Sequence, residues 1–260
     1  MIQPLSYVHP NTKIADNVVI DPFVTIAKNV EIGKGTWIGS NVTIMEGARI
    51  GENCRIFPGA VISGIPQDLK FGGEHTKLEI GKRNRIREHV TMNPGTTGGG
   101  GLTKVGDDGL FMMGVHIGHD CIVGDKVIMA NNASLGGHCI IEDNVVIGAL
   151  AGVHQFCRVG RGAMIGGLSA VVADVIPMGM VIGERANLDG LNLIGLKRKK
   201  YENKKIMELD AAFKKIFSSK NLHENLSKIN GEYKGNDLVA EVINFISKDK
   251  KRPICTPNSE

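Results

Sequence analysis

Residues 15–62 read ADNVVI-DPFVTI-AKNVEI-GKGTWI-GSNVTI-MEGARI-GENCRI-FPGAVI, with a hyphen drawn after every sixth residue. Every hexad ends in isoleucine, and the same phase reaches back through Ile14 to Val8. After two interruptions an apolar residue again recurs at every sixth position from Val105 to Val171. A helix repeats its apolar residues about every 3.6 positions and a strand about every 2. The period of six therefore predicts short, flat strands joined by corners, with three strands closing one triangular coil of eighteen residues.

Small or β-branched residues fill a second repeating position, two residues before each aliphatic residue, and we expect them to point inward as well. Glycine often follows the aliphatic residue, as in Ile32-Gly33, where we expect it to let the backbone turn the corner. The five cysteines include no Cys-x-x-Cys pair, which argues against disulfides and against a metal site. Four of them occupy the small inward position: Cys54, Cys121, Cys139 and Cys157.

Hexads of this kind resemble those of the hexapeptide-repeat family. The resemblance covers about residues 8–183 and implies an all-β fold, the left-handed parallel β-helix. After residue 195, apolar residues such as Ile206, Leu209 and Phe213 return at helical spacing. We therefore expect two domains, a left-handed parallel β-helix over residues 1–190 and a small α-helical C-terminal domain over residues 191–260 that caps the open end of the coils.

Charge and hydropathy limit the classes of function. No run of about eighteen apolar residues and no leader-like N-terminus occurs, so we expect a cytoplasmic protein without a membrane span. The net charge is +4, but residues 197–260 hold 15 Lys and Arg against 9 Asp and Glu. The basic character is therefore confined to the C-terminal end, where it suits an acidic protein or phosphate groups, and we expect no nucleic-acid partner.

Two segments interrupt the repeat. Residues 63–79 separate Ile62 from Ile80 by eighteen residues, which predicts a protruding loop that replaces one coil without changing the phase. Residues 94–104 contain four consecutive glycines, 98–101, and shift the phase by one residue. Long loops on a rigid solenoid commonly carry function.

Histidines gather in one column of the predicted coils. Residues eighteen apart should stack on one corner, and four of the eight histidines fall in the hexads headed by Ile117, Leu135 and Val153. The column contains His116, His119, Asp120, Gly136, Gly137, His138, His154 and Gln155. A stacked group of this kind beside two glycines predicts a functional site.

The residues of this column suit either a metal site or a general base. A neutral imidazole can take a proton from a hydroxyl that attacks a thioester, and His119 fits this role. Gly137 lies eighteen residues later, where its N–H, with no side chain in the way, can face a developing oxyanion. The nearby cysteines are expected to point inward, so a cysteine nucleophile is not favoured.

The segments around these residues are similar to the UDP-N-acetylglucosamine O-acyltransferase family, which carries out the first step of lipid A biosynthesis. The similarity rests on His116-Ile-Gly-His119-Asp120-Cys121, on Ala130-Asn-Asn-Ala and Gly136-Gly-His138, on Val153-His-Gln-Phe156, and on Gln67-Asp68-Leu-Lys70 and residues 83–88. It implies that His119 is the base, that Asp120 supports it electrostatically, and that Gly137 supplies the oxyanion contact.

The same resemblance implies the remaining site residues. Those expected to bind the sugar, the diphosphate or the acyl-pantetheine arm are Gln67, Asp68, Lys70, His116, His138, His154 and Gln155. Asn192 and Arg198 match the nucleotide side of the family pattern, although Ile194 and Lys199 depart from it. Gly167 matches the position that sets acyl length, where glycine leaves the groove open and implies a long 3-hydroxyacyl donor.

The resemblance also implies the partners: a homotrimer, acyl carrier protein and a UDP-amino sugar. It implies no cofactor and no metal, because the acyl-phosphopantetheine arrives on the carrier protein as substrate. The sequence leaves open whether the acceptor carries a 3-hydroxyl or a 3-amino group, and how long the acyl chain is. Other interpretations are an N-acyltransferase of the same pathway, a zinc carbonic anhydrase using His116, His119 and His154, and a noncatalytic scaffold.

Overall fold

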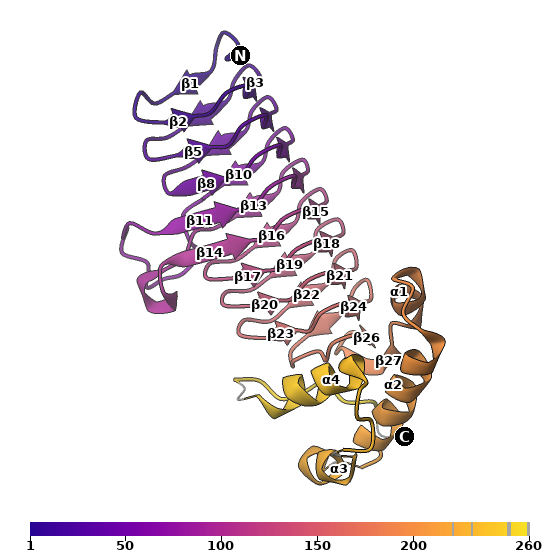
Figure 1. Cartoon of the computed structure of the whole chain (residues 1–260). Helices are drawn as coiled ribbons and strands as arrows, with labels where there is room; N and C mark the ends of the chain where they lie inside the picture. Colours follow the sequence, from indigo (N-terminus) through magenta and orange to yellow (C-terminus); the bar gives the residue numbers. More distant parts are fainter. Residues whose placement is uncertain (220, 230, 249–250, 259–260) are drawn as a thin grey trace.

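The computed structural model describes residues 1–219, 221–229, 231–248 and 251–258, and its main body is a triangular prism of stacked coils (Figure 1). Each coil contributes one short strand to each of three parallel sheets, which we call face 1, face 2 and face 3. Face 1 holds β1 (Tyr7–Val8), β4 (Thr25–Ile26), β7 (Thr43–Ile44), β10 (Val61–Ile62), β13 (Thr91–Met92), β16 (His116–Ile117), β19 (Ser134–Leu135), β22 (Gly152–Val153) and β25 (Ala170–Val171).

The other two faces follow the same order along the prism. Face 2 holds β2 (Lys13–Ile14), β5 (Glu31–Ile32), β8 (Ala48–Ile50), β11 (Lys77–Ile80), β14 (Leu102–Val105), β17 (Ile122–Val123), β20 (Ile140–Ile141) and β23 (Arg158–Val159). Face 3 holds β3 (Val19–Ile20), β6 (Trp37–Ile38), β9 (Arg55–Ile56), β12 (Arg85–Ile86), β15 (Leu110–Phe111), β18 (Ile128–Met129), β21 (Val146–Ile147), β24 (Met164–Ile165), β26 (Gly179–Ile182) and β27 (Asn187–Leu191). Only the β26–β27 pair among these is antiparallel.

The interior of the prism is filled by the residues that the repeat predicts. The hexad isoleucines from Ile20 to Ile62 and the four inward cysteines are buried. Burial raises the pKa of the Cys54 thiol to about 11 and that of Cys157 to about 12, so these thiols stay protonated near neutral pH. The cysteines are packing residues, as expected.

The role of the hexad glycines differs from the prediction. The residue that turns each corner in the left-handed conformation lies three positions after the aliphatic residue, as at Asn17 (φ 57°) and Asn29 (φ 55°). Gly33, which directly follows its aliphatic residue, has no such φ; a Cβ built there would lie 2.6 Å from the carbonyl carbon of Gly51 in the next coil. Glycine at this position therefore permits close stacking of coils rather than the turn itself.

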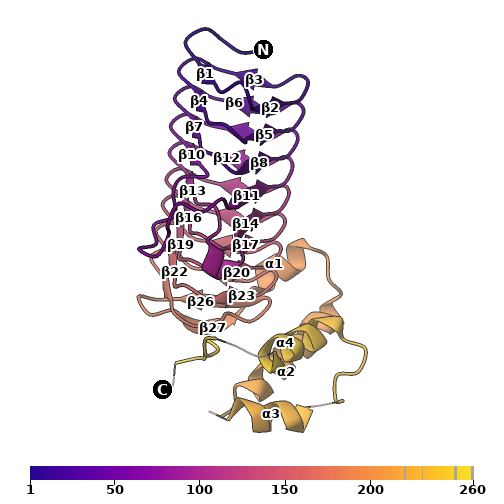
Figure 2. The same ribbon diagram turned by 90° about the vertical axis from the view of Figure 1, so that its left-hand side faces the viewer.

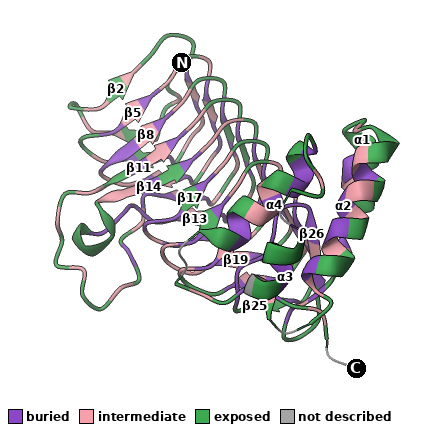
Figure 3. Ribbon diagram, turned by 60° about the horizontal axis from the view of Figure 1, so that its bottom comes forward, coloured by how far each residue is buried: buried purple, intermediate pink, exposed green. Residues whose placement is uncertain are grey.

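Both loops leave the prism at the corner between face 1 and face 2 (Figure 2). The first runs from β10 on face 1 to β11 on face 2, and β11 pairs with β8 of the preceding coil. The prediction that it replaces a coil is wrong: the eighteen residues from Ile62 to Ile80 span one corner, twelve more than the usual six. The second loop joins β13 to β14 and contains the short 3₁₀ helix η1 (Thr97–Gly99). In Figure 3 the first of these loops is coloured mainly as exposed or intermediate.

Within the part of the chain that the structure describes, four helices lie at the C-terminal end of the prism, opposite the N-terminus: α1 (Leu193–Arg198), α2 (Asn203–Ile216), α3 (Leu222–Ile229) and α4 (Asp237–Ser247). The chain then returns to the prism, where Ile254 forms a parallel bridge with Asp174 below face 2. This tail covers the open strand edge that the last coil would otherwise expose. Since the tail of the predicted C-terminal domain pairs with the prism, the domain boundary at residue 190 stays a prediction. Within the described residues, no helix combines the length and apolarity needed to span a membrane.

Candidate active site

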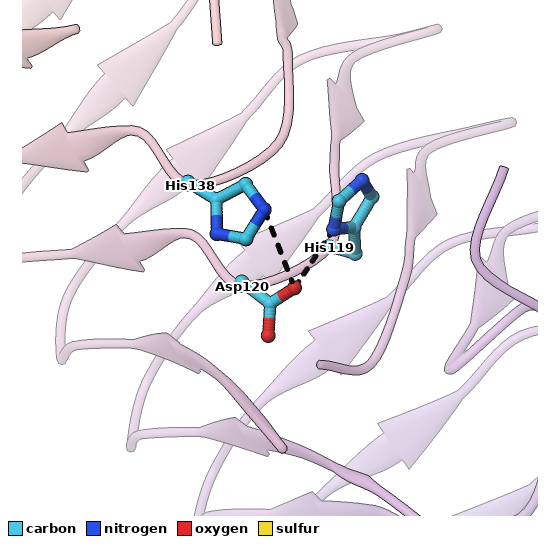
Figure 4. Close-up of side chains that lie close together, drawn as sticks. All are labelled: His119, Asp120 and His138. Carbon is cyan, nitrogen blue, oxygen red and sulfur yellow. Dashed lines mark hydrogen bonds and ion pairs between the residues drawn. The ribbon is translucent and has the colours of Figure 1, made fainter. Parts of the chain in front are cut away.

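The site is centred on His119 and Asp120, at the corner between face 1 and face 2 that follows β16. The His119 Nδ1 lies 2.8 Å from Asp120 Oδ2 (Figure 4). The Asp120 side chain is only 1% exposed. A carboxylate at this position accepts a hydrogen bond from Nδ1–H and so leaves Nε2 of the neutral ring free to take a proton. The pair is thus arranged as a base and its orienting acid.

The second loop holds the carboxylate in place. The Thr96 N–H donates to Asp120 Oδ1 at 2.8 Å, and the Thr96 hydroxyl donates to Oδ2 at 2.7 Å. The Asp120 N–H donates to the Thr103 hydroxyl at 2.7 Å. Gly99 lies directly against the carboxylate, since a Cβ there would be 2.0 Å from Asp120 Cγ. No motif in the sequence pointed to Thr96, Gly99 or Thr103 as partners of Asp120, although the run of glycines 98–101 was an available signal.

Gly137 lies beside the His119 ring, as the eighteen-residue spacing predicts. A Cβ on Gly137 would be 2.6 Å from both Cε1 and Nε2 of His119. The His138 N–H donates to the His119 carbonyl at 2.9 Å, which links the two coils. Among the described residues, the Gly137 N–H donates no hydrogen bond, so it is available to a ligand. The predicted juxtaposition is confirmed, whereas the chemical roles stay predictions.

His138 packs between an aromatic ring and the His119–Asp120 pair. Its ring stacks on Phe156 at 4.5 Å and meets His119 edge-on at 5.0 Å. Its Nε2 lies 3.9 Å from Asp120 Oδ2. Burial lowers the pKa of His138, and the Asp120 carboxylate partly offsets this effect. His138 is therefore placed as a neutral ring at the edge of the site.

Within the described residues, one group of side chains has the spacing of a metal site: His119, Asp120 and His138, whose ligand atoms lie within 4.8 Å of one another. It differs from the set expected for a zinc carbonic anhydrase, which required His116 and His154. Asp120 also uses both oxygens to accept hydrogen bonds from Thr96 and His119. The arrangement fits acid–base chemistry better than metal binding.

A cavity of about 570 Å³ runs from this pair along face 1. It brings together six of the predicted residues: Gln67, His116, His119, Gly137, His154 and Gln155. The outward side chains shrink along the face, from His116 through Ser134 to Gly152 and Ala170, which leaves room for an elongated ligand. The pKa of His116 is lowered by burial and by His119, and its Nδ1 lies 2.8 Å from the Thr91 hydroxyl.

Other predicted residues lie outside this cavity. Asp68 and Lys70 belong to the exposed first loop, where the Lys70 N–H donates to the Asp68 carboxylate at 3.0 Å. Gly167, at the corner between face 3 and face 1, does not line the cavity either, and a Cβ there would meet the Ala149 carbonyl oxygen at 3.2 Å. The acyl-length role of Gly167 stays a prediction.

Asn192 and Arg198 line a separate cavity of about 500 Å³ on face 3, together with Ile194 and Lys199. The Asn192 side chain caps α1 by accepting the Gly195 N–H at 3.0 Å. Within one chain, the expected nucleotide side therefore does not meet the His119 side.

Comparison with known proteins identifies the family. A model of the bacterial transferase hexapeptide (six repeats) matches residues 29–64, and a model described as UDP N-acetylglucosamine O-acyltransferase, domain 2, matches residues 174–255. A curated acyl-[acyl-carrier-protein]–UDP-N-acetylglucosamine O-acyltransferase from Caulobacter vibrioides is 53% identical over 202 residues, 77% of each chain. The chain belongs to the UDP-N-acetylglucosamine O-acyltransferase family. A Paracoccus denitrificans protein of the same name is 46% identical over 199 residues, 76% of each chain.

The fold agrees with this family. The crystal structure of a UDP-N-acetylglucosamine acyltransferase from Bacteroides fragilis superposes with a TM-score of 0.93 at 42% identity, covering 98% of this chain and 99% of that one. The predicted left-handed parallel β-helix of hexapeptide repeats with a small helical C-terminal region is confirmed. The carbonic anhydrase and scaffold interpretations are not favoured.

Proposed function

We propose that the chain transfers a 3-hydroxyacyl group from acyl carrier protein to the 3-hydroxyl of UDP-N-acetylglucosamine, the first step of lipid A biosynthesis. The observation that carries the proposal is the contact of 2.8 Å between His119 Nδ1 and Asp120 Oδ2. This pair lies beside Gly137, at the end of an elongated cavity. The names of the relatives from Caulobacter and Paracoccus support the same donor and acceptor.

The chemistry follows from the atoms of the pair. His119 Nε2 takes the proton from the sugar hydroxyl as its oxygen attacks the thioester carbonyl carbon. The tetrahedral oxyanion lies against the Gly137 N–H, a contact worth about 3 to 4 kcal/mol in comparable sites. The intermediate collapses, the carbon–sulfur bond breaks, and the imidazolium returns the proton to the leaving pantetheine thiolate. Asp120 stabilises that imidazolium throughout, and the reaction needs no cofactor.

A homotrimer would complete the site. In its N-terminal coils face 2 presents charged residues, including an ion pair of 3.0 Å between Lys13 and Glu31, and suits contact with water there. Face 3 instead presents a half-buried apolar column made of Leu110, Ile128, Val146, Met164 and Met180. Three chains arranged about a three-fold axis would bury face 3 of one chain against face 1 of the next. The Asn192 and Arg198 cavity would then approach the His119 cavity of a neighbour.

The distribution of charge suggests where the acyl donor docks, and the state of the cysteines suggests the compartment in which the chain works. The basic C-terminal end, including residues 197–200, is the proposed surface for acidic acyl carrier protein, where charge mainly assists encounter. All five cysteines are free, which suits a reducing cytoplasm.

The test is an assay of the purified chain with 3-hydroxyacyl carrier proteins and either UDP-N-acetylglucosamine or its 3-amino analogue, with products identified by mass. We expect the hydroxyl acceptor to be acylated and the product to be lost in His119→Ala. His9→Ala, at the far end of the prism, is the matched control and should keep full turnover. Acylation of the amino analogue alone would contradict the O-acyltransferase assignment. An active His119→Ala chain would show that His119 is not the general base.

A further inference from the structure

A cation from the end of the chain reaches the cavity. Arg252 Nη2 lies 2.7 Å from His154 Nδ1, and Arg252 Nε donates to the Gln155 carbonyl oxygen at 3.1 Å. The two nitrogens of one guanidinium edge therefore meet two acceptors on the face 1 side of the corner. Arg252 is nearly one hundred residues away in sequence, and no motif pointed to it.

The backbone on either side fixes this contact. The Asp174 N–H donates to the Pro253 carbonyl at 2.7 Å, and the Cys255 N–H donates to the Asp174 carbonyl at 2.8 Å. Ile254 and Cys255 are buried beneath the last coil. The tail is thus held as an added strand, and Arg252 has little freedom to leave the corner.

The contact decides which nitrogen of His154 carries the proton. His154 Nδ1 faces the Gln155 carbonyl oxygen at 3.2 Å, and a proton on Nδ1 would allow a hydrogen bond between them. Arg252 is always protonated and can only donate, so a proton on Nδ1 would oppose its N–H at 2.7 Å. With Nδ1 unprotonated, the lone pairs of both acceptors point at the guanidinium, and Nε2 carries the hydrogen of the neutral ring.

We propose that Arg252 is a positioning residue that holds His154 as the Nε2–H tautomer, so that His154 donates a hydrogen bond to an oxygen of the substrate in the cavity. His119 and His154 then differ through the group at Nδ1. The carboxylate of Asp120 makes His119 a proton acceptor at Nε2, whereas the guanidinium of Arg252 makes His154 a donor at Nε2. The substrate role rests on the proposed function, but the tautomer does not.

The first experiment measures the tautomer directly. The full chain is labelled with ¹⁵N-histidine, and two-bond ¹H–¹⁵N correlation spectra are recorded, with His154→Gln used to assign the ring. We expect His154 Nδ1 to show the shift of an unprotonated nitrogen in the wild-type chain and to lose this fixed state in Arg252→Met. A wild-type ring protonated at Nδ1, or an unchanged spectrum in Arg252→Met, overturns the proposal.

The second experiment separates positioning from structure and from charge. We expect Arg252→Met to raise KM about tenfold, the loss of roughly one hydrogen bond, with a smaller change in kcat. Arg252→Lys keeps the charge but not the two-donor edge, so we expect its KM to return only part of the way to the wild-type value. Added guanidinium should lower the KM of Arg252→Met toward the wild-type value. Lys34→Gln removes the same charge from an exposed residue of an N-terminal coil whose side chain forms no hydrogen bond or ion pair with the described residues, and it should leave KM unchanged.

Each outcome decides the proposal. An equal loss in Lys34→Gln, or complete recovery in Arg252→Lys, means that charge alone matters and refutes the proposal. If Arg252→Met does not fold, Arg252→Lys and the wild-type spectrum still test the tautomer. A wild-type chain without acyltransferase activity refutes the proposed function alone, because the spectrum is read without turnover.

Discussion

Gly137→Ala tests the juxtaposition on which the chemistry depends. The added methyl would lie 2.6 Å from His119 Cε1 and Nε2, whereas ordinary contacts begin near 3.4 Å. The imidazole must therefore shift by about 0.8 Å, the difference between these two distances. Gly137 does not have a positive φ, so alanine adds no backbone strain. The perturbation is directed at the ring and not at the fold.

The expected loss of activity follows from that displacement. A misplacement of about 1 Å in a catalytic group costs on the order of 10²-fold in rate. A shift of His119 also lengthens its 2.8 Å bond to Asp120, which weakens the orientation of the ring. We therefore expect kcat to fall roughly 10²-fold, with a smaller change in KM, because the other residues that line the cavity are not displaced.

Steady-state assays with the acyl donor, together with thermal unfolding, check this result. Gly72→Ala is the matched control, since its methyl would meet only Glu74 Oε2, at an ordinary 3.6 Å. It should keep its activity and melting temperature. Full activity in a folded Gly137→Ala chain would show that the position of His119 does not limit the reaction, and the general-base reasoning would fail.

Three further predictions concern the loops and the assembly. The Glu74 carboxylate accepts the Thr97 hydroxyl hydrogen at 2.6 Å, which joins the two loops and holds the pKa of Glu74 at about 2, below the usual 4.5. The stabilising effect of this contact is present above pH 4.5 and is lost as pH falls toward 2. The difference in unfolding midpoint between wild type and Glu74→Gln should therefore shrink over that range. A constant difference would contradict a stabilising role for the Glu74–Thr97 contact. Gly167→Met should reduce turnover of long acyl donors by roughly 10- to 200-fold and spare short ones, and an unchanged chain preference would exclude the acyl-length role. Co-expressed His119→Ala and Arg198→Ala chains should regain about a quarter of wild-type activity. Random mixing would make roughly three quarters of the trimers mixed, and each mixed trimer would hold one intact site in three. No recovery of activity would refute sites shared between chains.

The periodic part of the molecule could be predicted from the sequence because one rule governs it. The isoleucines of residues 14–62 and the inward cysteines are all held by the same interior, so the period reports the fold directly. The juxtaposition of His119 and Gly137 followed from the same rule. The prediction for the first loop failed because eighteen residues fit both a coil and a long corner, and only strand pairing tells these apart.

Contacts between distant segments could not be predicted in this way. Thr96 reaches Asp120 from a loop that has no period, and Arg252 reaches His154 only after the helices return the tail to the prism. Neither position carries a residue type that would attract notice alone. Such partners depend on where the chain leaves and rejoins the prism, which a local pattern does not encode.

The two loops and the His119–Asp120 pair share one corner for a physical reason. Each strand and its corner take six residues, with no spare backbone, so the corner alone cannot enclose a carboxylate. Asp120 becomes buried only because the second loop, in the preceding coil, covers it with Thr96 and Gly99. The first loop contributes Gln67 to the cavity and Glu74 to the support of the second loop. The prism thus supplies rigid spacing along its axis, whereas the insertions supply the burial that lets His119 and Asp120 act as a pair away from water.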